Sequence, residues 1–302
     1  MFVPLLALIA VWAWPRWRWL TIGGWALVPL LAAALFRPYA GPIVTVLELV
    51  LCVCSLRAID GALNIPGVRR LELLRYALDL SRSIGVSAAP TRRSGLIRAS
   101  RGALLLALGL LAGLWMRSAA LWRQHGYLDD LAAVAVGGML FTGLADIAIG
   151  SAWLLGSPVP DVHDARFPLS NGLVEFWGRR WNRSFGGTLS RVIFRARRMR
   201  RRPSLGVMLT FFVSGLAHAL PMLVAFADLR ASALLAGAAM LFFLLHGIGV
   251  LLESALPRRL RQGLAPRVLL WATWALTAPL YAPAILVAIG LLDRPLSTLP
   301  LL

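Results

Sequence analysis

The sequence contains no lysine and few charged side chains of any kind. All 31 basic residues among its 302 are arginine, against 13 Asp and Glu, and only 15% of the chain is charged. Hydrophobic residues make up 59% of the chain, and the mean hydropathy is +0.75. A soluble domain of this length needs more polar side chains to cover its surface. The composition therefore excludes an ordinary soluble fold and indicates an integral membrane protein.

Cysteine is nearly absent, and no motif for a metal or a phosphate group is present. Cys52 and Cys54 are two residues apart in an apolar run. They point to different sides of a helix and cannot pair with each other, so we interpret both as packing residues. We expect no metal and no cofactor. The first residues lack a basic segment and a small-residue cleavage site, so we expect no removed signal peptide.

Long apolar runs dominate the rest of the chain. About 20 apolar residues are needed to cross a bilayer as a helix. Eight runs approach this length, at about residues 1–14, 19–36, 41–56, 102–121, 131–155, 205–227, 231–252 and 268–291. We predict an all-α fold, a polytopic membrane helical bundle of about eight spans that forms a single domain over residues 1–302.

Two long connections separate these runs, residues 57–101 and 156–204. Within the first, residues 68–84 have the pattern of an amphipathic helix on the membrane surface, with Leu71, Leu74 and Leu78 on one face. Residues 85–100 are predicted to be a loop.

The arginines are distributed very unevenly over the connections. With eight spans, 26 of the 31 fall on one side of the membrane and five on the other. Such an excess marks the cytoplasmic side, so it is explained by orientation rather than by nucleic acid binding. We predict a multi-pass protein of a bacterial inner membrane with both long connections in the cytoplasm, and no nucleic acid partner.

Two acidic residues, Glu48 and Asp146, lie within the predicted spans, and a third, Glu253, lies at the end of one. A charge at the bilayer centre costs about 2.5–3.5 kcal/mol on insertion scales, so each needs a partner or water. Glu253 is near a span end, where it is expected to face water or an arginine. For the deeper Glu48 and Asp146 we favour structural pairing over catalysis.

Two histidines also lie within spans. His218 has the small residues Ser214 and Gly215 on the same helical face, which leaves room beside the imidazole for a neighbouring helix or for a substrate. Pro221 follows and predicts a bend next to the histidine. For His246, in the next span, a packing contact is favoured over a catalytic role.

A short segment before these spans is rich in tryptophan and arginine. Glu175 and Arg179 are four residues apart, as are Trp177 and Trp181. This spacing predicts an interfacial helix with an ion pair on one face and a tryptophan stripe on another. It does not explain Asn182 at the end of the helix, whose amide can donate two hydrogen bonds.

Three blocks of sequence in this region carry a family resemblance. Residues 176–182 read FWGRRWN and follow RFPLS at 166–170; residues 211–218 read FFVSGLAH; residues 242–248 read FFLLHGI and are followed by Glu253. In this order and spacing they resemble the wax synthase branch of the membrane-bound O-acyltransferases. The resemblance covers about residues 160–255, and its first block is the most specific.

The resemblance implies a helical bundle with an internal tunnel, in which Asn182 and His218 are the catalytic pair. It implies transfer of an acyl group from acyl-CoA, the co-substrate, to the hydroxyl of a lipophilic alcohol, as in a wax ester synthase. Family members commonly have glutamate directly after the catalytic histidine, and this chain has Ala219 there.

Roles for individual residues follow from this assignment. His218 is expected to take the proton of the acceptor hydroxyl as a general base, and Asn182 to hydrogen-bond the thioester oxygen or to position the acyl donor. The expected substrate-binding residues are Trp177, Arg179, Arg180, Trp181, Ser214, Gly215 and His246. The arginines among them suit the phosphates of acyl-CoA.

Two alternatives remain open at this point. A proton-coupled transporter would place His218, Glu48 and Asp146 on a proton path, although the inverted repeat of such proteins is not found. A non-catalytic lipid-binding relative is the second alternative, because of Ala219.

Overall fold

The computed structural model describes residues 18–39, 41–64, 70–78, 91–118, 127–157, 159, 161–164, 167–194 and 197–288. These residues contain helices and no strand, which confirms the all-α fold. The predicted span at residues 1–14 lies outside them. The chain divides into two compact units, residues 1–83 with 185–251 and residues 84–184 with 252–302.

Six helical segments in the described part are long and apolar enough to cross a membrane, which confirms a multi-pass membrane protein. They are residues 22–39 of α2 (Arg18–Phe36) and η1 (Arg37–Tyr39), then α5 (Arg92–Ser118), α6 (Tyr127–Leu154), α10 (Pro203–Leu223), α11 (Leu229–Ala255) and α13 (Ala265–Ala288). The prediction of a loop over residues 85–100 is wrong for 92–100, where α5 has already begun. A further helix, α3 (Pro42–Asn64), contains the predicted span 41–56 but is not among the six.

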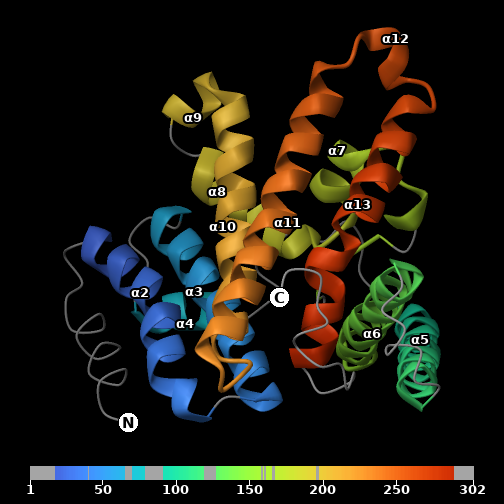
Figure 1. Ribbon diagram of the computed structural model, residues 1–302. Helices are drawn as coiled ribbons and strands as arrows, with labels where there is room; N and C mark the ends of the chain where they lie inside the picture. The colour runs from blue at the N-terminus through green and yellow to red at the C-terminus, as the bar shows by residue number, and fades with distance from the viewer. Residues whose placement is uncertain are drawn as a thin grey trace. The chain divides into compact units, whose positions relative to one another are not determined.

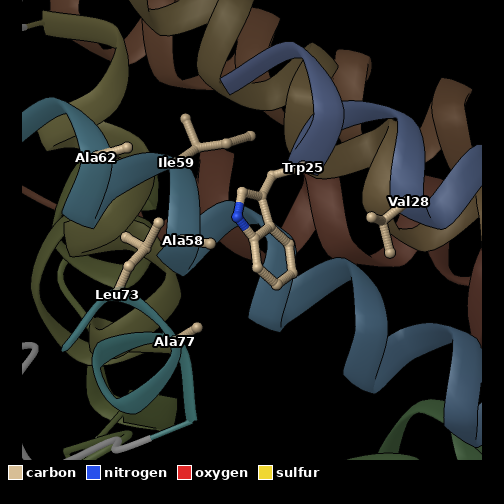
Figure 2. Packing of buried hydrophobic residues seen from close by; sticks show 7 residues of the cluster. All are labelled: Trp25, Val28, Ala58, Ile59, Ala62, Leu73 and Ala77. Atoms are coloured by element: carbon tan, nitrogen blue, oxygen red, sulfur yellow. The ribbon is translucent and has the colours of Figure 1, made fainter. Parts of the chain in front are cut away.

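In the first unit, α2, α3 and α4 (Arg70–Leu78) pack around one apolar cluster, shown in Figure 2. Helix α4 lies where a surface helix was predicted, although its buried face is formed by Leu73, Tyr76 and Ala77. Leu78, on the face predicted to contact the membrane, is 63% exposed. The cluster residues are Trp25, Val28, Ala58, Ile59, Ala62, Leu73 and Ala77.

A buried polar network fixes α4 to its neighbours. The carboxylate of Asp60 is fully buried and accepts hydrogen bonds from the Tyr76 hydroxyl at 2.7 Å and the Arg191 guanidinium at 2.6 Å. The guanidinium of Arg57 donates to the backbone oxygens of Tyr76 and Ala77 at the end of α4. Carbonyls in the last turn of a helix have no intrahelical partner, so Arg57 caps α4.

Helix α10 packs against α3 in the same unit. Cys52 is buried between Ala217 and Leu220, which confirms the packing role predicted for it. The end of α10 is held by Arg37, whose guanidinium donates to the backbone oxygen of Leu223. Two Arg-bearing helices, α8 (Arg183–Phe194) and α9 (Arg197–Arg201), precede α10 in the chain.

In the second unit, α5 and α6 lie side by side (Figure 1) along a seam of glycines. A Cβ at Gly143 would lie 2.7 Å from the Leu106 nitrogen, and a Cβ at Gly102 would lie 2.7 Å from the Gly143 oxygen. Helices in membranes pack most closely where small residues face each other. Gly95 and Gly150 extend the seam, which therefore brings the two backbones into direct contact.

Helix α13 completes this unit by packing against α6. Its Leu286 joins an apolar cluster that also contains Met116, Ala133, Val136 and Leu140. The unit also contains the end of α11, from residue 252, and four short helices: η4 (Phe167–Leu169), α7 (Leu173–Glu175), η5 (Phe176–Arg180) and α12 (Arg258–Arg261).

Candidate active site

The FWGRRWN segment forms a π-helix. The N–H of Trp181 donates to the oxygen of Phe176 at 2.8 Å, a bond between residues five apart, and the π-helix η5 continues directly from α7. Residues five apart therefore share a face. Arg180 pairs with Glu175 at 2.6 Å, and the predicted Glu175–Arg179 pair is wrong; Arg179 is exposed. π-turns occur frequently at functional sites.

The spacing of five residues in the π-helix also determines which aromatic rings pack together. Phe176 stacks on Trp181 with ring centroids 5.6 Å apart, and Trp177 stacks on Trp274 of α13 at 6.2 Å. Trp177 and Trp181 thus have different partners. The segment is held by aromatic contacts within its own unit as well as by any interface with lipid.

Asn182 follows the π-helix with a positive backbone angle, φ 41°, the only such non-glycine residue in the described part of the chain. Few residues with a side chain adopt this conformation, and asparagine is among those that tolerate it best. Two backbone hydrogen bonds hold the residues on either side: Asp164 N–H to Arg180 O at 2.9 Å, and Arg183 N–H to Val162 O at 2.6 Å. The direction of the amide is therefore set by a constrained backbone, as is common at functional sites.

His163 is flanked by Val162 and Asp164, whose backbone groups make these two bonds. It belongs to none of the sequence motifs. Its ring is 2% exposed and stacks on Trp181 at 5.2 Å, with Phe141 at 5.1 Å. Neither ring nitrogen has a hydrogen-bond partner among the described residues. Burial lowers the pKa of His163 to about 4, so the imidazole is neutral near pH 7. No local pattern marks this residue, because its neighbours come from distant parts of the chain.

Asp146 is fully buried on α6 and paired twice. Its carboxylate oxygens accept hydrogen bonds from Arg98 at 3.0 Å and from Arg101 at 2.6 Å, and Arg98 also pairs with Asp161. The predicted structural pairing of Asp146 is thus confirmed. Both carboxylate oxygens are engaged by guanidiniums, which argues against a place on a proton path.

Glu48 in the first unit is different. It is fully buried, and the described residues include no arginine paired with it; the thiol of Cys52 lies 3.9 Å from one of its oxygens. The expected ion pair of Glu48 is not found there.

Helices α7 and η5 together form one short helix, residues 173–180, called the motif helix below. Neither Ser170 nor Asn171 caps its start. The N-cap residue is Gly172, while the Ser170 hydroxyl donates to Phe167 O and the Asn171 side-chain oxygen accepts from Arg267. The carboxylate of Glu175 reaches back to the Asn171 N–H at 2.7 Å. That bond, with the Arg180 guanidinium, holds the pKa of Glu175 below its ordinary value.

His218 lies in the first unit, on α10, and is half-buried. Its Nδ1 is 2.7 Å from the backbone oxygen of Ser214. A carbonyl only accepts hydrogen bonds, so Nδ1 carries the proton and the neutral ring has its lone pair on Nε2. The ring centroid is 4.4 Å from that of Phe243 and 6.0 Å from that of Phe185. The tautomer is the one that a general base at Nε2 requires.

The small residues beside His218 make room for a neighbouring helix. A Cβ at Gly215 would lie 3.1 Å from the sulfur of Met240 and 3.2 Å from the Cβ of Phe243, both on α11. Ser214 is buried, and its backbone oxygen serves His218. His246 is fully buried against Phe242 at 4.4 Å, which agrees with the packing contact favoured for it.

The sequence-predicted site residues thus form two groups, each within one unit. The second unit holds Trp177, Arg179, Arg180, Trp181 and Asn182, and the first holds Ser214, Gly215, His218 and His246. The described residues contain no group of three His, Cys, Asp or Glu suited to a metal ion.

The fold defines a multi-pass helical membrane protein, in which the positive-φ residue Asn182 follows the end of the motif helix. Residues 164–245 match the sequence model of the membrane bound O-acyl transferase family. This match and two curated relatives support the resemblance found in the motifs: residues 164–245 are similar to the membrane-bound O-acyltransferases, and the names of the relatives agree with their wax synthase branch.

Both relatives come from Arabidopsis thaliana. One, named probable long-chain-alcohol O-fatty-acyltransferase 7, is 37% identical over 98 residues, 30% of this chain and 27% of the relative. The other, named probable long-chain-alcohol O-fatty-acyltransferase 2, is 32% identical over 171 residues, 51% of this chain and 45% of the relative. The chain thus spans less than half the length of these relatives.

Proposed function

We propose that this protein is a membrane-bound O-acyltransferase that moves an acyl group from acyl-CoA to the hydroxyl of a lipophilic alcohol. The observation that carries the proposal is the set of motifs, with Asn182 in a constrained conformation and His218 as the Nδ1–H tautomer. The names of the two relatives support acyl transfer to an alcohol.

The chemistry needs no covalent enzyme intermediate and no cofactor. Nε2 of His218 takes the proton of the alcohol, and the alcohol oxygen attacks the thioester carbon. The amide N–H of Asn182 stabilises the negative oxygen of the tetrahedral intermediate. The carbon–sulfur bond then breaks, and the coenzyme A thiolate takes up the proton that His218 held. Both roles are taken from the family resemblance.

Further details belong to the same proposal. The exposed guanidinium of Arg179 suits the phosphates of acyl-CoA, whereas Arg180 is already paired with Glu175. We propose that the Arg-rich connections face the cytoplasm, where acyl-CoA is found. The purely arginine basic composition, typical of a GC-rich genome, favours a bacterial inner membrane.

The test is ester formation by purified protein with radiolabelled acyl-CoA and a panel of alcohols. Replacing His218 by alanine is expected to lower kcat by about 10²–10⁴-fold, the range for loss of a general base. Thr210→Val is a matched control, because Thr210 is on the same helix and, among the described residues, its hydroxyl bonds Gly206 O. Full activity of His218→Ala would remove this histidine from the mechanism. Absence of ester with every alcohol would favour the non-catalytic relative.

Asn182 requires a variant that separates its amide from its backbone. Asn182→Gly keeps a residue that adopts positive φ freely but removes the amide, and Asn182→Asp keeps the size but removes the N–H donors. We expect both to lose activity by about 10²–10³-fold, as for loss of an oxyanion donor. An active Asn182→Gly would mean that only the backbone conformation matters.

A further inference from the structure

The carboxylate of Glu253, at the end of α11, binds the start of the motif helix. Its Oε2 accepts hydrogen bonds from the backbone N–H of Leu173 and from that of Val174, the latter at 3.2 Å. Glu253 is 9% exposed and belongs to the same unit as the helix. N–H groups in the first turn of a helix have no intrahelical partner, so the side chain supplies the cap from 80 residues away.

There is no space for a side chain at Gly172 beside the Glu253 carboxylate. A Cβ on it would lie 2.5 Å from Oε1 and 2.7 Å from the carboxyl carbon of Glu253. Its backbone angles, φ 174° and ψ 179°, are extended and open to any residue, so close approach explains the glycine. Every larger side chain at this position would push the carboxylate away from the helix.

The capped helix is short, with three residues in α7 and five in η5. A helix of this length has little stability of its own and is held by its contacts. Its beginning is fixed by Glu253, and its end by the backbone bonds of residues 162–164 with Arg180 and Arg183. A shift of the first turn is therefore expected to reach Asn182, which follows the other end of this helix.

We propose that Glu253 is a positioning residue for Asn182, with Gly172 as the residue that admits its carboxylate. The role of Asn182 is that of the proposed function, on which this inference rests. Glu253 touches no reacting atom in this scheme and acts only through the motif helix. Arg179 lies on the same helix, but its long exposed side chain can follow a small shift, so substitution of Glu253 is expected to affect turnover more than acyl-CoA binding.

The variants Glu253→Ala and Glu253→Gln test this role. Removal of the acceptor is expected to lower kcat about 10–100-fold, since misplacement by about 1 Å costs up to about 10²-fold. KM for acyl-CoA should stay within about threefold. Glutamine keeps an acceptor oxygen of the same reach, so Glu253→Gln should keep at least about a third of the wild-type kcat. Wild-type kcat in Glu253→Ala overturns the proposal.

Gly172→Ala provides an independent perturbation that leaves the carboxylate in place. Its kcat should also fall about 10-fold or more. Combined with Glu253→Ala, the added methyl group meets no carboxylate, so the double variant should be no slower than Glu253→Ala alone. Strict multiplication of the two effects overturns the paired role, and so does an unchanged kcat in Gly172→Ala if Glu253→Ala does not fold.

Thr91→Ala is the matched control for loss of a helix cap. The Thr91 hydroxyl accepts the N–H of Ser94 at the start of α5, in the same unit. This variant should lower the melting temperature without lowering kcat. A loss of kcat in Thr91→Ala equal to that in Glu253→Ala would make the effect a general one of stability and overturn the proposal.

Amide hydrogen exchange separates failure of this inference from failure of the proposed function. Glu253→Ala should raise exchange at residues 173–181 at least about tenfold, whatever reaction the protein catalyses. If the wild type forms no ester, the proposed function fails, and the exchange result alone decides the capping role. Unchanged exchange at these residues overturns it.

Discussion

His163 is a buried imidazole whose protonation the fold opposes. Both ring nitrogens lack a partner among the described residues, and the ring stacks on Trp181. Burial lowers its pKa from 6.5 to about 4, and the nearby carboxylate of Asp146 only partly offsets this. Between pH 6.5 and 4 the unfolded chain therefore binds a proton that the folded protein excludes.

This difference in proton binding predicts that acid destabilises the folded protein, and that replacing His163 by phenylalanine reduces this effect. As pH falls from 6.5 to 4, His163 should cost the folded state up to about 3 kcal/mol, and no further loss should follow below pH 4. In His163→Phe the drop in melting temperature between pH 7.5 and pH 5 should be smaller than in the wild type, measured in detergent.

The control for this prediction is Phe141→Leu, which alters the packing around the ring at 5.1 Å but leaves the imidazole in place. It should keep the wild-type dependence on pH. Equal pH dependence in the wild type and in His163→Phe would contradict a buried neutral histidine.

The role of a residue could be predicted where its neighbours in the sequence form a recognisable motif. Asn182 and His218 stand within motifs, and the pairing of Asp146 follows from the cost of a charge in the bilayer. The contact of Glu253 was predicted wrongly, as water or an arginine, and His163 was missed, because their partners lie 80 and 18 positions away. No periodicity reports such contacts; only the folded chain does.

At the scale of the element, helix positions followed from apolar runs, whereas the register of the motif helix did not. Spacing by four is the rule for α-helices, and it predicted Glu175–Arg179. The π-turn replaces that rule by a spacing of five and selects Arg180. The same turn brings Phe176 onto Trp181, a contact that an α-helical pattern does not contain.

The glycine seam between α5 and α6 predicts that Gly→Ala lowers stability at one glycine of α6 and does not lower it at another. In Gly143→Ala the new methyl group meets the backbone at Leu106 and Gly102, at 2.7 and 2.8 Å. This overpacking should destabilise the protein by about 1–3 kcal/mol. In Gly138→Ala, where nothing lies within 4 Å, the higher helix propensity of alanine should be neutral or stabilise by up to about 1 kcal/mol.

Thermal unfolding of both variants in detergent measures the difference. The two changes are chemically identical and five residues apart on α6, so lipid and detergent effects are shared. A Gly143→Ala variant as stable as Gly138→Ala would contradict the contact between the two backbones.

For the whole molecule, the class of fold followed from hydropathy, whereas the number of spans stays a prediction, because residues 1–14 lie outside the described part and α3 is not among the six candidate spans. Helix α3 shows why: Glu48, Arg57 and Asp60 lower its hydropathy, yet all three are buried. Arg57 caps α4, and Asp60 binds Tyr76 and Arg191. Counting the charged residues makes α3 look too polar for a membrane span, because the count leaves out the buried groups that these side chains bind.

The orientation of the chain in the membrane is the prediction that belongs to this scale. Helix α10 is 21 residues long, about 32 Å, which is enough to cross about 30 Å of hydrocarbon. Arg198 before it and Ala227 after it are both exposed. With the arginine-rich side in the cytoplasm, Arg198 should face inward and Ala227 outward.

Single cysteines at these two positions measure this orientation. In a Cys52→Ala, Cys54→Ala background, Ala227→Cys should react with a membrane-impermeant thiol reagent in intact cells. Arg198→Cys should react only after the membrane is opened, and labelling of both in opened cells controls for exposure. The reverse pattern would invert the orientation and place the Arg-rich connections outside. Equal labelling of both in intact cells would mean that α10 does not cross the bilayer, since one helix then has both ends on the same side.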